Sequence, residues 1–124
     1  MAVQNGIALL GKVNIEIPQG TLFTNVFPVK DATGEDIDVS TGYTAILQAR
    51  EAVDSETAVI DLDEAAGLTL GDGTITMTLA ASATAAYDFE QLGFSLQLTK
   101  TAGTEVTELA WGALRLRKSY VQPA

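Results

Sequence analysis

The sequence predicts an all-β fold: an antiparallel β-sandwich, Ig-like or jelly-roll-like, of about seven or eight strands with one short helical crossover. Three observations predict it. Apolar and polar residues alternate with a period of two through most of the chain, as in strands with one face in a core and the other in water. Glycine, aspartate and serine recur between these runs, where tight turns need them. Only 19% of the residues are charged, and much of the remaining polar surface is threonine, which suits a half-buried strand position. A barrel is the second interpretation.

The alternation defines most of the strands directly. The clearest run is Thr74–Leu79, in which isoleucine, methionine and leucine alternate with three threonines. The regular runs cover residues 13–17, 43–50, 58–63, 74–79, 94–99 and 114–117. Turn residues separate them at 31–34, 40–42, 71–73 and 101–103, and the last turn joins two strands as a hairpin.

Two strands are less regular. Residues 22–30 carry apolar side chains at both parities, so this strand is either covered on both faces or bent at Pro28, which favours an edge or a bulge. In the last strand, Leu109 and Trp111 share one parity while two later leucines share the other. One inserted residue would bring all four side chains to the same face, so we predict a β-bulge at Gly112 or Ala113.

One helix is expected, with Ser82 as its N-cap and a single short stretch over Ala83–Tyr87. The 124 residues are the length of one domain, so we expect a single domain over residues 1–124. The two ends, 1–10 and 118–124, are candidate assembly arms. The first ten residues form either the first strand of this sandwich or an arm that adds to a neighbour's sheet.

The composition excludes several classes of function. The chain has no cysteine and no histidine, which removes disulfides, Cys/His zinc sites and every catalytic triad with a histidine base. A net charge of −9 repels nucleic acid and anionic lipid, so neither is expected as a partner. No basic segment with a cleavage site and no long apolar run indicates a signal peptide or a membrane span. We therefore expect no enzyme, no cofactor and no small-molecule ligand.

The acidic residues cluster in loops, and this clustering has two interpretations. Ten of them lie between residues 31 and 64: Asp31, Glu35, Asp36, Asp38, Glu51, Asp54, Glu56, Asp61, Asp63 and Glu64. They form either a solvated face that keeps the protein soluble or a calcium site, although no EF-hand spacing is present. A glycosidase pair of carboxylates is not supported, because these acids lie in polar loops without aromatic neighbours.

The C-terminal end is basic, and it suggests contacts between copies. Arg115, Arg117 and Lys118 stand near the end of the last strand, followed by Tyr120. With an acidic region elsewhere on the chain, they favour head-to-tail or lateral association; alternatively, they protect an edge strand from aggregation. The candidate interface residues are Arg115, Arg117 and Tyr120 at this end, with Leu9 and Leu10 at the N-terminal end.

Several segments resemble one family of proteins. Residues 31–42, D-A-T-G-E-D-I-D-V-S-T-G, resemble the D-x-x-G-x-x-x-D-(L/V)-(S/T)-x-G segment of small β-sandwich domains in tailed-phage virion proteins, such as the N-terminal domain of upper baseplate proteins. Gly73–Leu79 is similar to a strand of that family, and Ser82–Tyr87 to its short helix. Phe94–Thr99 resembles the strand that enters its hairpin, and residues 111–116 resemble its closing strand.

The resemblance implies a structural component of a virion, made in the host cytoplasm, with other virion proteins and copies of itself as partners. It implies no catalytic or cofactor residues. The function expected from the sequence is therefore assembly in a tailed-phage particle, as a tail, baseplate or head-decoration (cement) protein and as a homo-oligomer. The alternative is an adhesin-like or carbohydrate-binding sandwich, with or without calcium, that uses the loops at 31–42 and 63–73.

Overall fold

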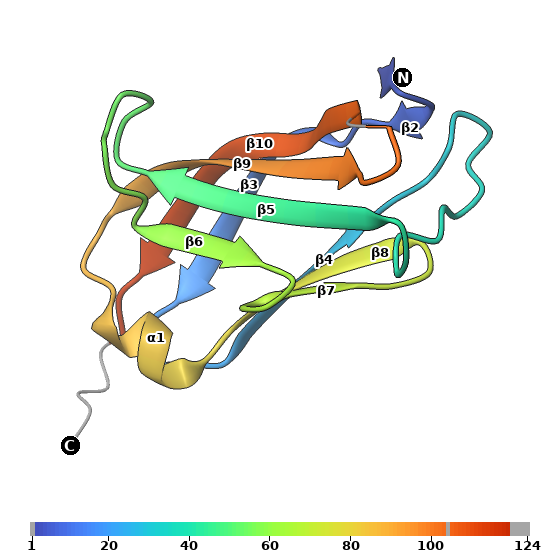
Figure 1. Cartoon of the computed structure of the whole chain (residues 1–124). Helices are drawn as coiled ribbons and strands as arrows, with labels where there is room; N and C mark the ends of the chain where they lie inside the picture. Colours follow the sequence, from blue (N-terminus) through green and yellow to red (C-terminus); the bar gives the residue numbers. More distant parts are fainter. Residues whose placement is uncertain (1, 104, 120–124) are drawn as a thin grey trace.

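Two β-sheets face each other across a shared apolar core in the computed structural model, which describes residues 2–103 and 105–119 (Figure 1). The larger sheet contains, in spatial order, β3 (Gly11–Pro18), β10 (Glu105–Arg117), β9 (Gln91–Lys100), β5 (Tyr43–Arg50) and β6 (Ile60–Asp63). The smaller sheet contains β4 (Phe23–Pro28), β8 (Thr74–Leu79) and β7 (Leu68–Leu70). A hairpin of β1 (Val3–Gln4) and β2 (Ile7–Ala8) and one helix, α1 (Ala81–Ala86), complete the described elements. The predicted all-β sandwich with a short helical crossover is confirmed.

Strand pairing in the two sheets is antiparallel with one exception among the described strands. β3 runs parallel to β10, from Gly11 opposite Ala110 to Pro18 opposite Arg117. This pairing places the first long strand beside the last one, so one side of the larger sheet carries residues from both ends of the described chain. The other edge of this sheet is β6, and the edges of the smaller sheet are β4 and β7.

The core forms because alternate side chains of both sheets point inward. In β8 the apolar positions are buried, and the three threonines between them lie on the outer face. Phe27 of β4 meets Phe94 of β9 across the two sheets, with ring centroids 6.5 Å apart. Pro28 ends β4 at an edge of the smaller sheet, the position that the second interpretation of this strand favoured, and its missing N–H breaks no ladder. The first interpretation, a strand covered on both faces, is wrong, because Val26 is 54% exposed.

The last strand differs from the prediction at its bulge. The extra residue is Leu109, where the register with β9 shifts. Leu109 and Ala110 are both fully buried, and Trp111 then points outward with 46% of its surface exposed. The predicted bulge at Gly112 or Ala113 is wrong, because the alternation changes phase before Trp111 rather than after it.

The helix is held by a buried threonine rather than by a cap. Its N-cap position is Ala80, which makes no side-chain capping bond, and Ser82 lies inside the helix, so the predicted Ser82 cap is wrong. Thr84 is fully buried, and its Oγ1 donates to the Thr21 carbonyl at 2.7 Å. Helices this short depend on such tertiary contacts. Across residues 2–103 and 105–119, no helix is both long enough and apolar enough to span a membrane.

Candidate functional site

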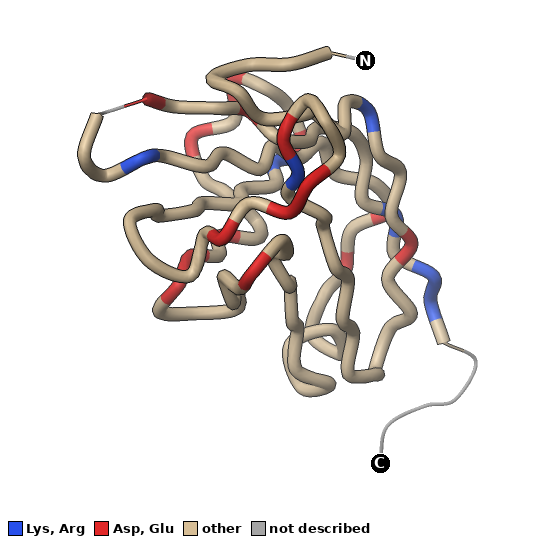
Figure 2. The backbone as a smooth tube through the Cα atoms, turned by 90° about the vertical axis from the view of Figure 1, so that its right-hand side faces the viewer, with Lys and Arg blue, Asp and Glu red and all other residues tan. Residues whose placement is uncertain are grey.

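The two sides of the larger sheet differ in charge: the β3–β10 side has a small basic excess, because Glu16, Glu105 and Glu108 stand among its cations, and the β6 side is acidic. The basic edge, formed by β3, β10 and the residue after β10, carries Lys12, Arg115, Arg117 and Lys118. The acidic edge, formed by β6 and the turn after it, carries Asp61, Asp63 and Glu64. All seven residues are exposed. In Figure 2, blue segments follow the right-hand strands toward the C-terminal end, whereas most red segments lie at the centre and left.

Part of the basic edge is already paired within the chain. Arg117 Nη1 lies 3.4 Å from Glu16 Oε1, and Lys118 pairs at 3.3 Å with a carboxylate in the loop after α1. Exposed pairs of this kind contribute only about 0–1 kcal/mol. Lys12 and Arg115 form no ion pair with any residue that the structure describes. These two cations are therefore the ones that remain for a partner.

The acidic edge also supports local structure. Asp63 Oδ1 accepts two backbone hydrogen bonds of the following turn, at 2.9 and 3.1 Å. Glu64 Oε1 accepts the Ala45 N–H at 3.1 Å, beyond the end of the β5–β6 ladder. Asp61 Oδ1 accepts a longer bond, 3.3 Å, from Gln48 Nε2. Asp61 is thus the member of this edge that is least involved in backbone structure.

The N-terminal candidates lie away from the C-terminal ones. Leu9 and Leu10 are half-buried, and the Leu10 N–H donates to the Leu109 carbonyl of β10 at 2.9 Å. Ile7, just before them, is part of the core. These leucines stand at one end of the β3–β10 pairing, and the arginines stand toward the other end. The structure therefore does not bring the two groups together, and Tyr120 lies outside the described residues.

In the loop after β4, two aspartates serve as turn caps. Asp31 Oδ1 accepts the Thr33 hydroxyl at 2.6 Å and the N–H groups of Thr33 and Glu35 at 2.9 and 3.1 Å. Asp38 accepts the hydroxyl and the N–H of Ser40 in the same way. These hydrogen bonds, led by the hydroxyls, lower the pKa of both carboxyl groups from the ordinary 3.8. Among the described residues, no three or more acidic side chains converge as a calcium site requires.

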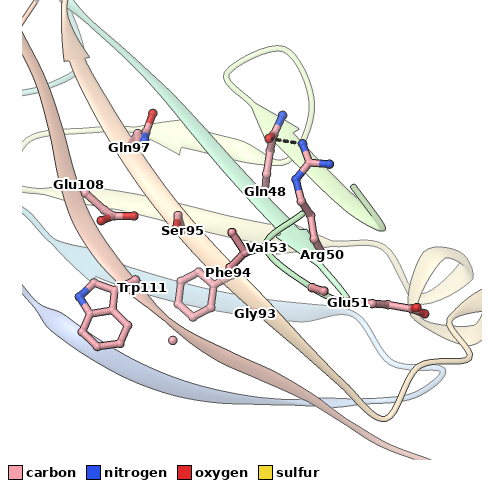
Figure 3. Close-up of a pocket in the computed structure, with 12 residues that line it drawn as sticks. Gln48, Arg50, Glu51, Val53, Gly93, Phe94, Ser95, Gln97, Glu108 and Trp111 are labelled. Carbon is pink, nitrogen blue, oxygen red and sulfur yellow. Dashed lines mark hydrogen bonds between the residues drawn. The ribbon is translucent and has the colours of Figure 1, made fainter. Parts of the chain in front are cut away.

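A hollow of about 630 Å³ lies on the outer face of the larger sheet, over β10, β9 and β5 (Figure 3). Its lining residues, which define the Trp111 hollow, are Gln48, Arg50, Glu51, Ala52, Val53, Gly93, Phe94, Ser95, Gln97, Glu108, Trp111 and Gly112. In Figure 3, Trp111 and Glu108 stand on one side of β9, and Gln48 and Arg50 stand on the other. The hollow is therefore a cross-strand site over the three inner strands of the sheet, and it shares β10 with the basic edge.

Hydrogen bonds hold one wall of the hollow in place. Arg50 Nη2 donates to Gln48 Oε1 at 3.0 Å, and Arg50 Nη1 donates to the Ser55 carbonyl at 2.9 Å. Ser55 in turn accepts the Ala52 N–H through its hydroxyl at 3.1 Å. The loop between β5 and β6 is thus tied to the sheet by these hydrogen bonds.

The Trp111 hollow was not predicted from the sequence, although the sequence contains one signal for it. Trp111 shares its parity with Arg115 and Arg117, which belong on the outer face because they are charged. No bulge is needed between residues of the same parity. That pattern alone predicts that Trp111 points outward. The predicted bulge after Trp111 instead placed its side chain on the same face as the leucines, in the core.

A scan against profiles of known protein families finds no match, and a search of curated proteins finds no sequence relative. The features of this chain that bear on function are the charged edges, the hollow and the motif resemblance.

Proposed function

We propose that this chain is a structural assembly protein that joins copies of itself and neighbouring proteins in a tailed-phage particle. The observation that carries the proposal is the difference in charge between the two sides of one sheet. A surface patch that complements a different patch on the same molecule produces head-to-tail contacts, which close into rings or extend into rows. A partner protein with one matching edge could join the same series.

The contact would place the basic edge of one copy against the acidic edge of the next. Lys12 and Arg115 would supply cations that form no ion pair among the described residues, and Asp61 would supply a carboxylate whose one described hydrogen bond comes from Gln48. Complementary charge steers the encounter and fixes the register, while the unpaired outer sides of β3 and β6 offer backbone hydrogen bonds. Burial of neighbouring apolar surface would supply most of the affinity.

The resemblance to virion domains supports the location in a phage particle. Two glycines of the resembling segment, Gly34 and Gly42, have φ angles of 90° and 79°. Glycine adopts this conformation at no steric cost, so these positions have the turn role that the motif implies.

The test is the association state as a function of salt and edge charge. Sedimentation velocity at low ionic strength should show concentration-dependent oligomers that dissociate as salt screens the edges. Arg115→Glu should weaken this association strongly. Lys100→Glu, with the same change in net charge at an exposed site away from the basic edge, should not.

A mixing experiment tests the head-to-tail geometry. Arg115→Glu damages only the basic edge, and Asp61→Lys damages only the acidic edge, so each variant alone should stay small. Their mixture should form heterodimers, because each variant retains the edge that the other lacks. A chain that is monomeric at high concentration and low salt, or variants that associate like the unmodified protein, would exclude this mode of assembly.

A further inference from the structure

Trp111 is the one tryptophan of the chain, and about half of its surface, 46%, is exposed on the outer face of the larger sheet. Its cross-strand neighbours are Ser95 on β9 and Lys12 on β3. Ser95 is too small to cover an indole, and Lys12 is long and exposed. An aromatic ring in this position presents one apolar surface surrounded by polar groups, which suits a ligand with one apolar face.

The hollow exists because small residues meet in register. Gly93 of β9 pairs with Ala113 of β10 on one side and with Arg50 of β5 on the other. Ser95, next to them on β9, also has a small side chain, and these residues form the floor of the hollow. The guanidinium of Arg50 and the loop residue Val53 form its opposite wall (Figure 3). The volume of about 630 Å³ falls in the range of about 300–1,000 Å³ of small-ligand sites.

The polar groups of the hollow are of two kinds. Ser95, Gln97 and Glu108 have no hydrogen bond from their side chains to any described residue, so a hydroxyl, an amide and a carboxylate are open to a ligand. Gln48 and Arg50 are held by each other and by the loop, so the opposite wall is fixed. Together these groups offer both donors and acceptors at several positions.

The charge of the hollow selects a neutral ligand. Charges of both signs surround the hollow: Glu108 and Lys12 lie beside Trp111, and Arg50 lies on the opposite wall with the neighbouring Glu51 (Figure 3). A net charge of either sign on a ligand is therefore repelled by part of this surface. Of the large apolar side chains that line the hollow, Trp111 and Val53 are exposed and Phe94 is buried in the core, so the hollow has fewer exposed apolar groups than the packed cluster at the centre of a protein interface. The chemistry that remains is an uncharged polyhydroxylated ring: its C–H face packs on an aromatic ring, and its hydroxyls both donate and accept.

We propose that the Trp111 hollow binds a neutral pyranose unit of a glycan. The indole stacks against the sugar ring, Gln97 and Glu108 bind its hydroxyls from one side, and the Gln48–Arg50 wall closes the other side. This site differs from the loops at 31–42 and 63–73 that the sequence suggested for carbohydrate. Its lining includes none of the charged residues assigned to the two edges, so it does not depend on the assembly proposal, although it shares β10 with the basic edge.

The single tryptophan makes the test specific, because all indole fluorescence comes from the proposed site. Maltotriose, cellotriose and triacetylchitotriose, titrated into the millimolar range, present α-glucose, β-glucose and N-acetylglucosamine units. At least one should produce a saturable change in emission. Trigalacturonate, which is anionic, and tetramethylammonium chloride should not.

Two variants distinguish a site from a general surface effect. Ser95→Arg keeps Trp111 but fills the floor, so it should weaken binding by tenfold or more. Val106→Ala changes an exposed apolar residue of the same strand outside the hollow, so its binding should match the unmodified protein. Circular dichroism verifies that both variants fold.

Four outcomes overturn the proposal: no saturable change with any of the three neutral sugars, an equal response to the charged probes, an equal loss in both variants, or no effect of Ser95→Arg on binding. If instead Ser95→Arg abolishes self-association and no sugar binds, the hollow belongs to a contact between copies. Because sugar binding and the salt-dependent association of the edges are measured separately, either proposal can fail without the other.

Discussion

Gly112 is the glycine at which the structure predicts that substitution by alanine lowers stability most. A Cβ added at Gly112 would lie 1.9 Å from the Val13 carbonyl oxygen of β3, whereas real Cβ contacts essentially never fall below 3.0 Å. β3 would have to retreat by about 1.1 Å. Gly112 also has a φ of 152°, which L side chains rarely adopt. Gly112→Ala therefore combines a backbone clash with backbone strain.

The expected cost follows from these two terms. A retreat of this size breaks about two β3–β10 hydrogen bonds, each worth about 1 kcal/mol. Forcing alanine into the unfavourable φ adds about 1–3 kcal/mol. The free energy of unfolding should therefore fall by about 3–5 kcal/mol, and the midpoint of urea unfolding by about 2 M. The assay is urea denaturation followed by circular dichroism.

Gly93→Ala is the matched control, since it makes the same substitution on the neighbouring strand. The nearest atom to an added Cβ there, the Gly112 carbonyl oxygen, is 4.0 Å away, an ordinary contact. Its unfolding free energy should change by less than about 1 kcal/mol, because the loss of chain flexibility offsets small adjustments. If the two variants differ by less than about 1 kcal/mol, β3 is not held against β10 as the structure describes.

Three further predictions concern the core, the helix and pH. Leu96→Ala, at a fully buried position of the central strand, should lower the free energy of unfolding by about 2–5 kcal/mol in urea titrations. Thr84→Val keeps the volume but removes the bond to the Thr21 carbonyl, so thermal unfolding should report a loss of about 1–3 kcal/mol. Asp31 and Asp38 have folded pKa values below the ordinary 3.8, so their contribution to stability is complete above that value and is lost as the pH falls through the lower folded values. The double Asp→Asn variant should therefore lose less stability on acidification than the unmodified protein, as acid titrations at fixed urea can measure.

The strands were predictable because a strand with one buried face has alternating apolar and polar residues, a period of two. Tyr43–Arg50 and Thr74–Leu79 have the same bounds in sequence and structure, since each has one buried and one exposed face. The last strand was harder to predict. Alternation shows which side chains of a strand point outward only where a charged residue identifies the outer face. In the last strand Arg115 identifies that face, but the apolar character of Trp111 favoured a position in the core. The exposure of Trp111 therefore indicates a surface role, because the hydrophobicity of the side chain alone would favour burial.

Other features required information that short patterns hold weakly or not at all. Asn5 and Gly6 have φ angles of 53° and 78°, and this dipeptide is the strongest short signal for a two-residue hairpin. The dipeptide therefore indicates a hairpin, and the structure places β1 and β2 on its two sides where the sequence predicted one strand or an arm. The hollow could not be predicted from a short sequence pattern. It depends on Gly93 and Ala113, 20 positions apart, being opposite each other, and only the pairing register establishes that.

The charged edges and the Trp111 hollow use different parts of one sheet, and this separation has a consequence. Contacts between β3 and β6 of successive copies would extend the sheet sideways and leave its outer face uncovered. Every copy in a row would then present its hollow on the same side. A single shallow site binds weakly, but linked sites bind a repeating polymer with an avidity far above that of one site. The two surfaces therefore reinforce each other. Association through the edges places several Trp111 hollows side by side, whereas one domain has a single hollow.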